Sequence, residues 1–301
     1  MTDLFQQLPT SVLQMGAIFL SIMIEALPFV LIGSIISGFI DVYITPDRVH
    51  AFLPQNKILR ILFGTFVGFI FPSCECGIVP IVNHFLEKKV PTYTAVPFLA
   101  TAPIINPIVL FATYTAFGNS VRFALFRALG SILVALVLGI FWGFVAKAPI
   151  LKQDGAKVHS HDFSDKRGWT KVGYALIQAI DEFFDMGRYL VFGCLFASFV
   201  QVYVPTYVLT RIGHNSLTAI LLMMVLAFLL SLCSEADAFI GASLLASFGF
   251  APVMAFLIIG PMIDIKNLLM MKNHFTNKFI LQFISLITLV ILAYCLMIGG
   301  F

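Results

Sequence analysis

The sequence predicts an all-α polytopic membrane protein, and three observations lead to this fold class. Hydrophobic residues make up 60% of the 301 residues and charged residues only 11%, whereas ordinary soluble domains carry about 25% charged residues. The mean hydropathy is +0.99. Apolar runs that are long enough to cross a bilayer, which takes roughly 20 residues, recur along the whole length. We therefore expect a multi-pass protein of the cell membrane that lies in contact with the lipid bilayer.

About eight apolar segments follow one another, and one long polar stretch divides them four and four. The polar stretch at 147–171 carries charges of both signs. It predicts a first membrane repeat at 1–146, a connecting loop at 147–171 and a second membrane repeat at 172–301. The segments lie at approximately 12–40, 58–86, 91–117, 121–146, 173–204, 214–247, 250–271 and 277–300.

The two middle segments of each half carry polar interruptions. The second and sixth segments are interrupted at PSCECG and LCSEAD, and the third and seventh at TAPIINP and GPMIDIK. Proline removes a backbone donor and clashes with the preceding turn, while glycine permits strained backbone angles. The motifs therefore predict broken helices at matching positions in the two halves. This pattern is typical of a binding site at the centre of a transporter.

The polar landmarks of the two halves keep a common register. A shift of 160 residues lays Glu25 on Asp185 and SCE on CSE, and a shift of 158 lays TAPIIN on IGPMID. We interpret this as an internal duplication. Four complete spans per half would make the repeats parallel, and one re-entrant segment per half would make them inverted. The Lys and Arg residues that flank the spans are divided almost evenly between the two sides, so their count does not show which side is cytoplasmic. Arg127 and Lys266 are counted among these flanking residues.

Four carboxylates lie inside the interrupted segments: Glu75, Glu235, Asp237 and Asp264. A carboxylate near the middle of a span costs roughly 2.5 to 3.5 kcal/mol, so it needs a partner or a water-lined cavity. We predict that these residues bind the substrate or an ion. The alternative is a buried structural network, for instance between Asp264 and Lys266, unless Lys266 extends to the membrane surface.

Two cysteines flank the first of these carboxylates. Cys74 and Cys76 would lie about 200° apart on a regular helix, as would Glu235 and Asp237. A locally unwound SCECG motif could instead turn both thiols toward one cavity. Together with Ser73 and Glu75, and with Cys233 from the second half, they would form a substrate site or a site for a bound soft metal ion. Two alternatives remain: small residues that permit close helix packing, and a redox dithiol, whose disulfide would be strained at this spacing.

Further polar residues mark the edges of the predicted site. Asn106, in the interruption of the third segment, would complete the site from the side opposite the cysteines, although TAPIINP also fits a proline-kinked packing helix. Glu25 would line the cavity or fix a helix pair. Asp185 and Arg188 have the i,i+3 spacing of an ion pair on a helix. Cys194 and Cys295 are surrounded by apolar residues and fit small buried side chains.

Several function classes are excluded by what the sequence lacks. It has no P-loop, HExxH, GxSxG or dinucleotide fingerprint, so we expect neither an enzyme nor an ATP-driven pump. The mixed charge of 147–171 gives no indication of nucleic-acid binding. The motif HSHD within it is expected to be a solvated stretch.

The motifs PSCECG, TAPIINP, SEAD and GPMID, in a chain of this length, resemble those of the YraQ/ArsP-like permease family of prokaryotes. The resemblance covers essentially the whole chain and implies an eight-span permease. One branch of the family is associated with efflux of trivalent methylated arsenicals through cysteines within the membrane, which would place the substrate on Cys74 and Cys76 beside Glu75. Gram-positive relatives resemble one half of a pair that works with a second, smaller membrane protein.

The sequence therefore predicts a permease that moves a thiophilic metal, a metalloid or another small solute, with proton exchange at Glu75 and Glu235. The alternatives are a membrane scaffold subunit in a hetero-complex and, less favoured, an intramembrane thiol oxidoreductase. A second membrane protein and a homo-oligomer are both candidate partners.

Overall fold

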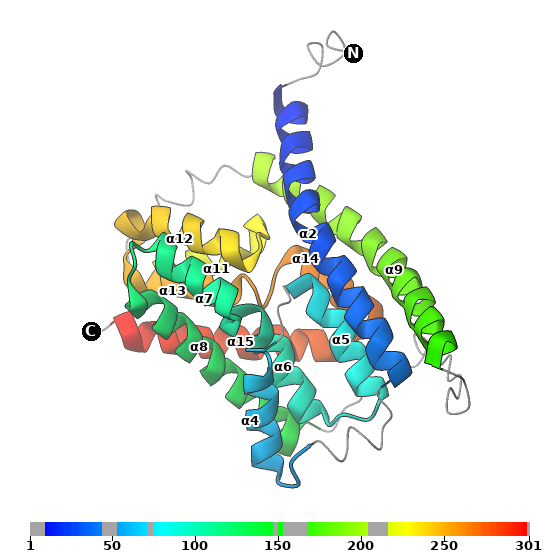
Figure 1. The fold of residues 1–301 in the computed structure, drawn as a ribbon. Coiled ribbons are helices and arrows are strands. Elements are labelled where there is room, and N and C mark those ends of the chain that lie inside the picture. The colour runs from blue at the N-terminus through cyan, green and yellow to red at the C-terminus, as the bar shows by residue number, and fades with distance from the viewer. Residues whose placement is uncertain are drawn as a thin grey trace.

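The computed structural model describes residues 10–43, 53–70, 75–146, 150–152, 168–203 and 216–299, and within these ranges the chain is almost entirely helical (Figure 1). The only β-structure there is an isolated bridge between Leu151 and Phe275. The elements are α2 (Thr10–Tyr43), α4 (Lys57–Val67), α5 (Glu75–Glu87), α6 (Thr92–Ile105), α7 (Pro107–Ala116), α8 (Val121–Ile140), η1 (Phe141–Val145), α9 (Gly168–Tyr203), α11 (Ser216–Leu230), α12 (Ser234–Phe248), α13 (Phe250–Ile259), α14 (Ile265–His274) and α15 (Asn277–Gly299).

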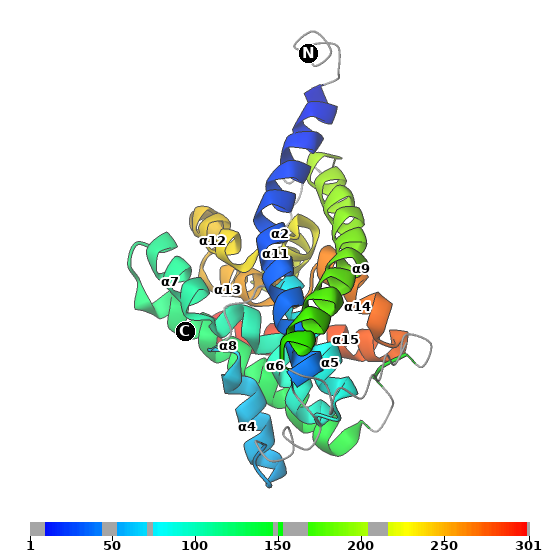
Figure 2. The ribbon, with the colours of Figure 1, turned by 45° about the vertical axis from the view of Figure 1, so that its right-hand side comes forward.

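The two longest helices, α2 and α9, run side by side in opposite directions along one flank of the molecule (Figures 1 and 2). Their backbones come close at Gly38, where a Cβ atom would collide with the carbonyl oxygen of Ala175. On the other side, α2 approaches α5, where a Cβ at Gly33 would lie 2.6 Å from Cα of Gly77. Glycine at positions 33 and 38 therefore lets α2 pack closely against both of its neighbours.

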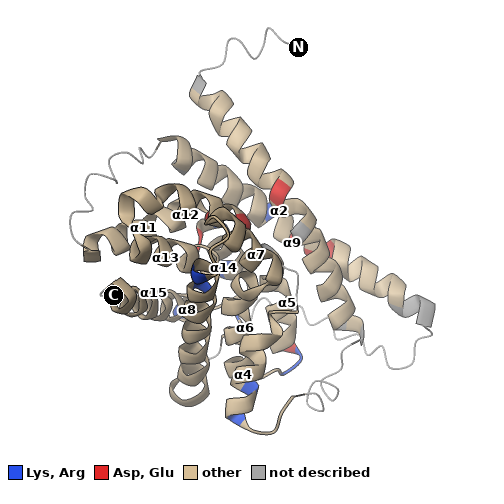
Figure 3. Ribbon diagram, turned by 60° about the vertical axis from the view of Figure 1, so that its left-hand side comes forward, with Lys and Arg blue, Asp and Glu red and all other residues tan. Residues whose placement is uncertain are grey.

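Two helices form the core of the remaining bundle. Almost every residue of α6 and α13 is buried, as expected for helices that are apolar on all sides. The helix α6 packs against α4 and α8, and α13 packs in the same way against α11 and α15. Figure 3 shows how few charged residues these helices carry, since long stretches of ribbon have neither an acidic nor a basic residue.

Several helices are long and apolar enough to cross a membrane, which confirms a multi-pass all-α membrane protein. Within the described ranges there are four: Ser11–Ile40, Val121–Val145, Val172–Tyr203 and Asn277–Gly299. The pair α6 and α7, bent by 40°, would make a fifth. The predicted number of eight is not confirmed. The other segments are divided into helices of 10 to 15 residues, each shorter than the roughly 20 residues that a span requires.

The helix breaks lie at the four predicted motifs. Helix α4 ends at Val67 and α5 begins at Glu75, and α11 and α12 are separated by residues 231–233. Asn106 separates α6 from α7, and residues 260–264 separate α13 from α14. One detail of the prediction was wrong, because SCECG is not unwound throughout: its last three residues form the first turn of α5. The carboxylate of Glu75, in the first turn of α5, is favourable because it lies at the positive end of the helix dipole.

Candidate functional site

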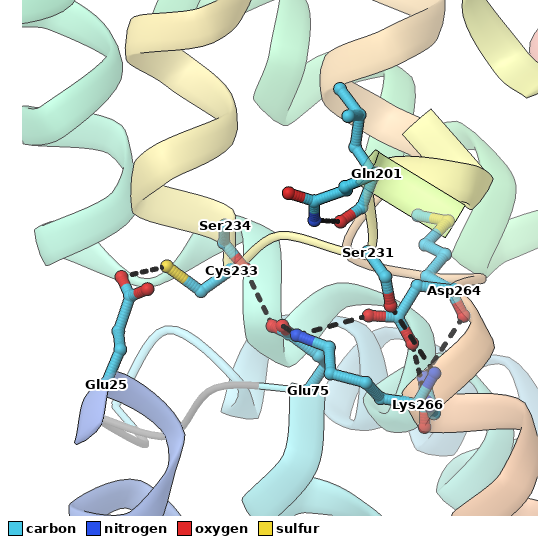
Figure 4. A network of polar contacts seen from close by, with 11 residues as sticks. Glu25, Glu75, Gln201, Ser231, Cys233, Ser234, Asp264 and Lys266 are labelled. Carbon is cyan, nitrogen blue, oxygen red and sulfur yellow. Dashed lines mark hydrogen bonds and ion pairs between the residues drawn. The ribbon is translucent and has the colours of Figure 1, made fainter. Parts of the chain in front are cut away.

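Buried polar side chains gather where three of the breaks meet, and Figure 4 shows them from close by. We call Glu75, Ser234, Asp264 and Lys266 the central cluster. Glu75 and Ser234 are the first residues of α5 and α12, and Asp264 and Lys266 lie at the start of α14. Each is at most 1% exposed. Helix starts from both halves of the chain thus bring two predicted site residues, Glu75 and Asp264, into one group.

A single ammonium group links the two carboxylates of the central cluster. Nζ of Lys266 lies 3.8 Å from Oε1 of Glu75 and 3.6 Å from Oδ2 of Asp264. Lys266 therefore does not extend to the membrane surface, and it is not one of the basic residues that flank a span. Burial of an ion pair requires this kind of mutual compensation, because each charge alone would lose its hydration.

Two serines at the α11–α12 break form hydrogen bonds with residues of the central cluster. The hydroxyl of Ser234 donates to Oε2 of Glu75 at 3.1 Å, and the hydroxyl of Ser231 accepts the backbone N–H of Lys266 at 3.4 Å. Neither serine was predicted as a site residue. Ser234 lies inside LCSEAD, the counterpart of the first motif, and Ser231 directly precedes it; this position was the signal that could have indicated them.

Asn106 and Asp264 have a common structural role. Oδ1 of Asn106 accepts the backbone N–H of Ile108 at 2.9 Å and caps α7, and Oδ1 of Asp264 accepts that of Asn267 at 2.5 Å and caps α14. Such caps satisfy donors that the start of a helix leaves free. The two residues that the sequence paired thus begin the second helix of their respective broken segments. Asp264 additionally takes part in the central cluster.

The two acidic residues of α12 face different surroundings. Asp237 is fully buried, whereas Glu235 is only half-buried. This agrees with the angle of about 200° that separates residues i and i+2 on a helix. The structure therefore does not bring the two carboxylates into one site.

A buried arginine that the sequence analysis placed among the flanking residues lies beside α12. Arg127 of α8 is 0% exposed. It donates from Nε to the carbonyl of Leu257 at 3.1 Å, from Nη1 to Oγ1 of Thr113 at 2.7 Å, and from Nη2 to the carbonyl of Ser234 at 3.0 Å. One side chain thereby joins α7, α8, α12 and α13. Its place near the start of an apolar segment gave no signal, because basic residues there usually reach the membrane surface.

The structure describes the side chains of three of the five cysteines: Cys194, Cys233 and Cys295. The thiol of Cys233 donates to Oε1 of Glu25 at 2.5 Å, which links α2 to the start of α12. Ser73, Cys74 and the side chain of Cys76 lie outside the described residues, so their place at the site stays a prediction. Cys194 and Cys295 are buried, as predicted for small apolar side chains. Among the described residues, no group of three or more metal-ligating side chains could hold a metal ion.

A second polar group, which the sequence analysis did not predict, lies toward the other end of α5. Nε2 of His84 lies 3.1 Å from Oε2 of Glu182 on α9, and Nδ1 lies 2.9 Å from Oε2 of Glu87. Because both ring nitrogens lie close to carboxylate oxygens, the geometry favours the positively charged imidazolium. The contact with Glu182 links α5 to α9.

Comparison with known protein families identifies the family of this chain. Residues 11–300 match the model of the ArsP_1 family, which is described as "Predicted permease". The chain belongs to this permease family. The match confirms the family resemblance that the motifs predicted. Together with the apolar helices, it also confirms that the chain is a multi-pass membrane protein.

Two curated relatives extend along nearly the whole permease chain. A Streptococcus mutans protein named "Putative two-component membrane permease complex subunit" is 67% identical over 296 residues, which is 98% of each chain. The UPF0718 protein YcgR of Bacillus subtilis is 44% identical over 291 residues, covering 97% of this chain and 99% of its own. No solved structure matches this chain.

Proposed function

We propose that this permease moves a small solute past the central cluster, and that the four broken helices build the binding site for that solute. The observation that carries the proposal is the burial of three charged side chains, Glu75, Asp264 and Lys266, where helices from both halves begin. Charged groups at such depth are costly in a purely structural role, and in membrane proteins they mark substrate and ion pathways. No sequence or structural feature of the described residues favours an enzyme instead.

We also propose that the two halves are repeats. Six α-helices lie on each side of the polar loop in the described ranges, and breaks follow in the same order. The packing supports a duplication, because α7 lies against α12 and the corresponding α14 lies against α5. Superposition of the two halves in an experimental structure tests this, and halves that share no common arrangement of helices would contradict it.

The substrate class that we propose is a thiophilic metal or metalloid. Its ligands would be Cys74 and Cys76, next to Glu75, because thiolates select soft ions. We predict that proteoliposomes containing the permease take up copper(I), zinc or arsenite, and that Cys74→Ser/Cys76→Ser abolishes this uptake. The matched control is Cys194→Ser/Cys295→Ser, which alters two buried thiols elsewhere and should retain it. Equal uptake by both double variants would rule out the thiophilic substrate.

A second membrane subunit is the partner that we propose, and the outer face of α9 is its docking surface. Asp181, Asp185 and Arg188 are exposed there within the candidate span Val172–Tyr203. Asp185 and Arg188 form the predicted i,i+3 ion pair at 3.0 Å, with side chains 62% and 57% exposed. Exposed apolar side chains lie on both sides of the charges, among them Ile177, Ile180, Phe184, Phe192 and Leu195.

Lipid does not solvate charges, so this face requires a covering helix with complementary polar groups. The name of the Streptococcus mutans relative, which describes a subunit of a two-component complex, supports a second protein as that cover. We expect a photo-crosslinker at Phe192 to capture a different membrane protein in native membranes. Asp185→Leu/Arg188→Leu should remove this crosslink, whereas Leu289→Ala on exposed α15 should not. Crosslinks only to lipid or to a second copy of the chain would contradict the assignment.

A further inference from the structure

The carboxyl group of Asp237 is buried without a hydrogen-bond partner. Asp237 lies in the first turn of α12 and is 0% exposed. Neither of its carboxyl oxygens has a hydrogen-bond partner among the described residues. An ionised carboxylate in such a place loses its hydration and no hydrogen bond replaces it, so the neutral acid is favoured.

The packing of Asp237 against α13 favours the neutral acid further. A Cβ atom built on Gly260 would lie 2.5 Å from Oδ2 of Asp237 and 3.3 Å from the carbonyl oxygen of Phe256. Gly260 is the C-cap residue of α13. The C-terminal end of a helix presents carbonyl oxygens and partial negative charge. These groups repel a carboxylate, whereas a protonated carboxyl can donate to them.

The charged groups around Asp237 do not offset this preference by direct contact. The charge of Arg127, on α8, favours the ionised form, although its three hydrogen bonds go to Leu257, Thr113 and Ser234 rather than to the Asp237 carboxyl. The other charged groups that act on Asp237 belong to the central cluster. Of these, Lys266 favours the ionised form and the carboxylates Glu75 and Asp264 oppose it. On α12 itself, Glu235 adds another negative charge, and α13 has no titratable side chain.

We infer that Asp237 is a proton-binding site of the permease, distinct from Glu75 and Glu235, and that its proton is exchanged when the site beside it changes conformation. The inference deepens the proposed function and rests on it for the link to transport. A proton fits better than a metal ion, because a proton needs one oxygen, whereas metal ions need several converging ligands. Asp237 differs from Glu75 in this respect: neither oxygen of Asp237 has a hydrogen-bond partner among the described residues, whereas Glu75 is paired with Lys266 and accepts a hydrogen bond from Ser234.

Infrared difference spectroscopy on the full chain in lipid tests the inference without any solute. Between acidic and alkaline buffer, the wild-type chain should show a protonated-carboxyl band that titrates. Asp237→Asn should lose this band, and Glu235→Gln, two residues away, should keep it. A band that is unchanged in Asp237→Asn would overturn the inference.

The melting temperature of the same variant provides an independent readout. Asparagine resembles the neutral acid in shape and polarity, so Asp237→Asn should melt at the wild-type temperature. A large fall would show that the carboxylate charge is structural and would overturn the inference. Because neither measurement involves uptake, both can succeed even if the permease carries none of the three proposed ions, and a failure here leaves the uptake experiment unaffected.

Discussion

Lys266→Met should destabilise the permease by about 3 to 5 kcal/mol, because it leaves the carboxylates of Glu75 and Asp264 buried without a cation. Methionine keeps the length and apolar stem of the side chain, so the effect reports the lost charge rather than a cavity. Thermal unfolding in detergent measures it. The control is Lys272→Met, on the same helix but exposed, which should change stability by less than about 0.5 kcal/mol.

A double variant makes this prediction sharper. Glu75→Gln removes one of the two charges that Lys266 compensates, so adding it to Lys266→Met should restore part of the lost stability. The two substitutions should therefore be non-additive, as expected for residues in contact. Equal effects of Lys266→Met and Lys272→Met, or strict additivity with Glu75→Gln, would show that the central cluster is not a coupled group.

Arg127→Met is expected to be the other severe substitution. It removes three hydrogen bonds at once and leaves the carbonyls of Leu257 and Ser234 without this donor in a buried place. A buried polar group without its partner costs about 1 to 3 kcal/mol, so we expect a loss of about 3 kcal/mol or more. Thermal unfolding again provides the measurement.

Two further variants of α8 test whether the geometry of Arg127 matters. Arg127→Lys keeps the charge but lacks the planar fork that reaches three acceptors, so it should lose an intermediate amount of stability. Arg122→Met alters an exposed arginine on the same helix, which lies 4.5 Å over the ring of Phe250, and should cost about 0.5 to 1 kcal/mol. If Arg122→Met were as damaging as Arg127→Met, the buried hydrogen bonds would not be the cause.

Local chemistry explains which parts of this architecture could be predicted from the sequence. The helix breaks were predictable because proline, glycine and capping residues act on their own turn of the chain, as Asn106 and Asp264 do. The opposed faces of Glu235 and Asp237 followed from helix geometry alone. The extent of unwinding at SCECG did not, because Glu75, where the helix starts, has its partners Ser234 and Lys266 in distant parts of the chain.

The burial of Arg127 and the contact of Lys266 with Glu75 could not be predicted for a related reason, although a buried pair of Asp264 and Lys266 was one of the alternatives. Both lie near the ends of apolar segments in the sequence, where basic residues usually reach the membrane surface. Their actual partners come from other helices: Thr113, Ser234 and Leu257 for Arg127, and Glu75 for Lys266. The partner of His84 on α9, Glu182, is also distant along the chain. Only the packing of the helices brings such groups together.

Labelling of native cysteines by a membrane-impermeant, water-soluble thiol reagent tests the central claim most directly, because it needs no knowledge of the solute. Cys233 is 9% exposed and lies at the α11–α12 break next to Ser234, whereas Cys194 and Cys295 are 0% exposed and packed within helices. If the central cluster lies on a transport path, mass spectrometry should find Cys233 modified in membranes while Cys194 and Cys295 stay unmodified. Modification of Cys233 no faster than that of Cys295 would mean that water does not reach the breaks, and would contradict the proposed path.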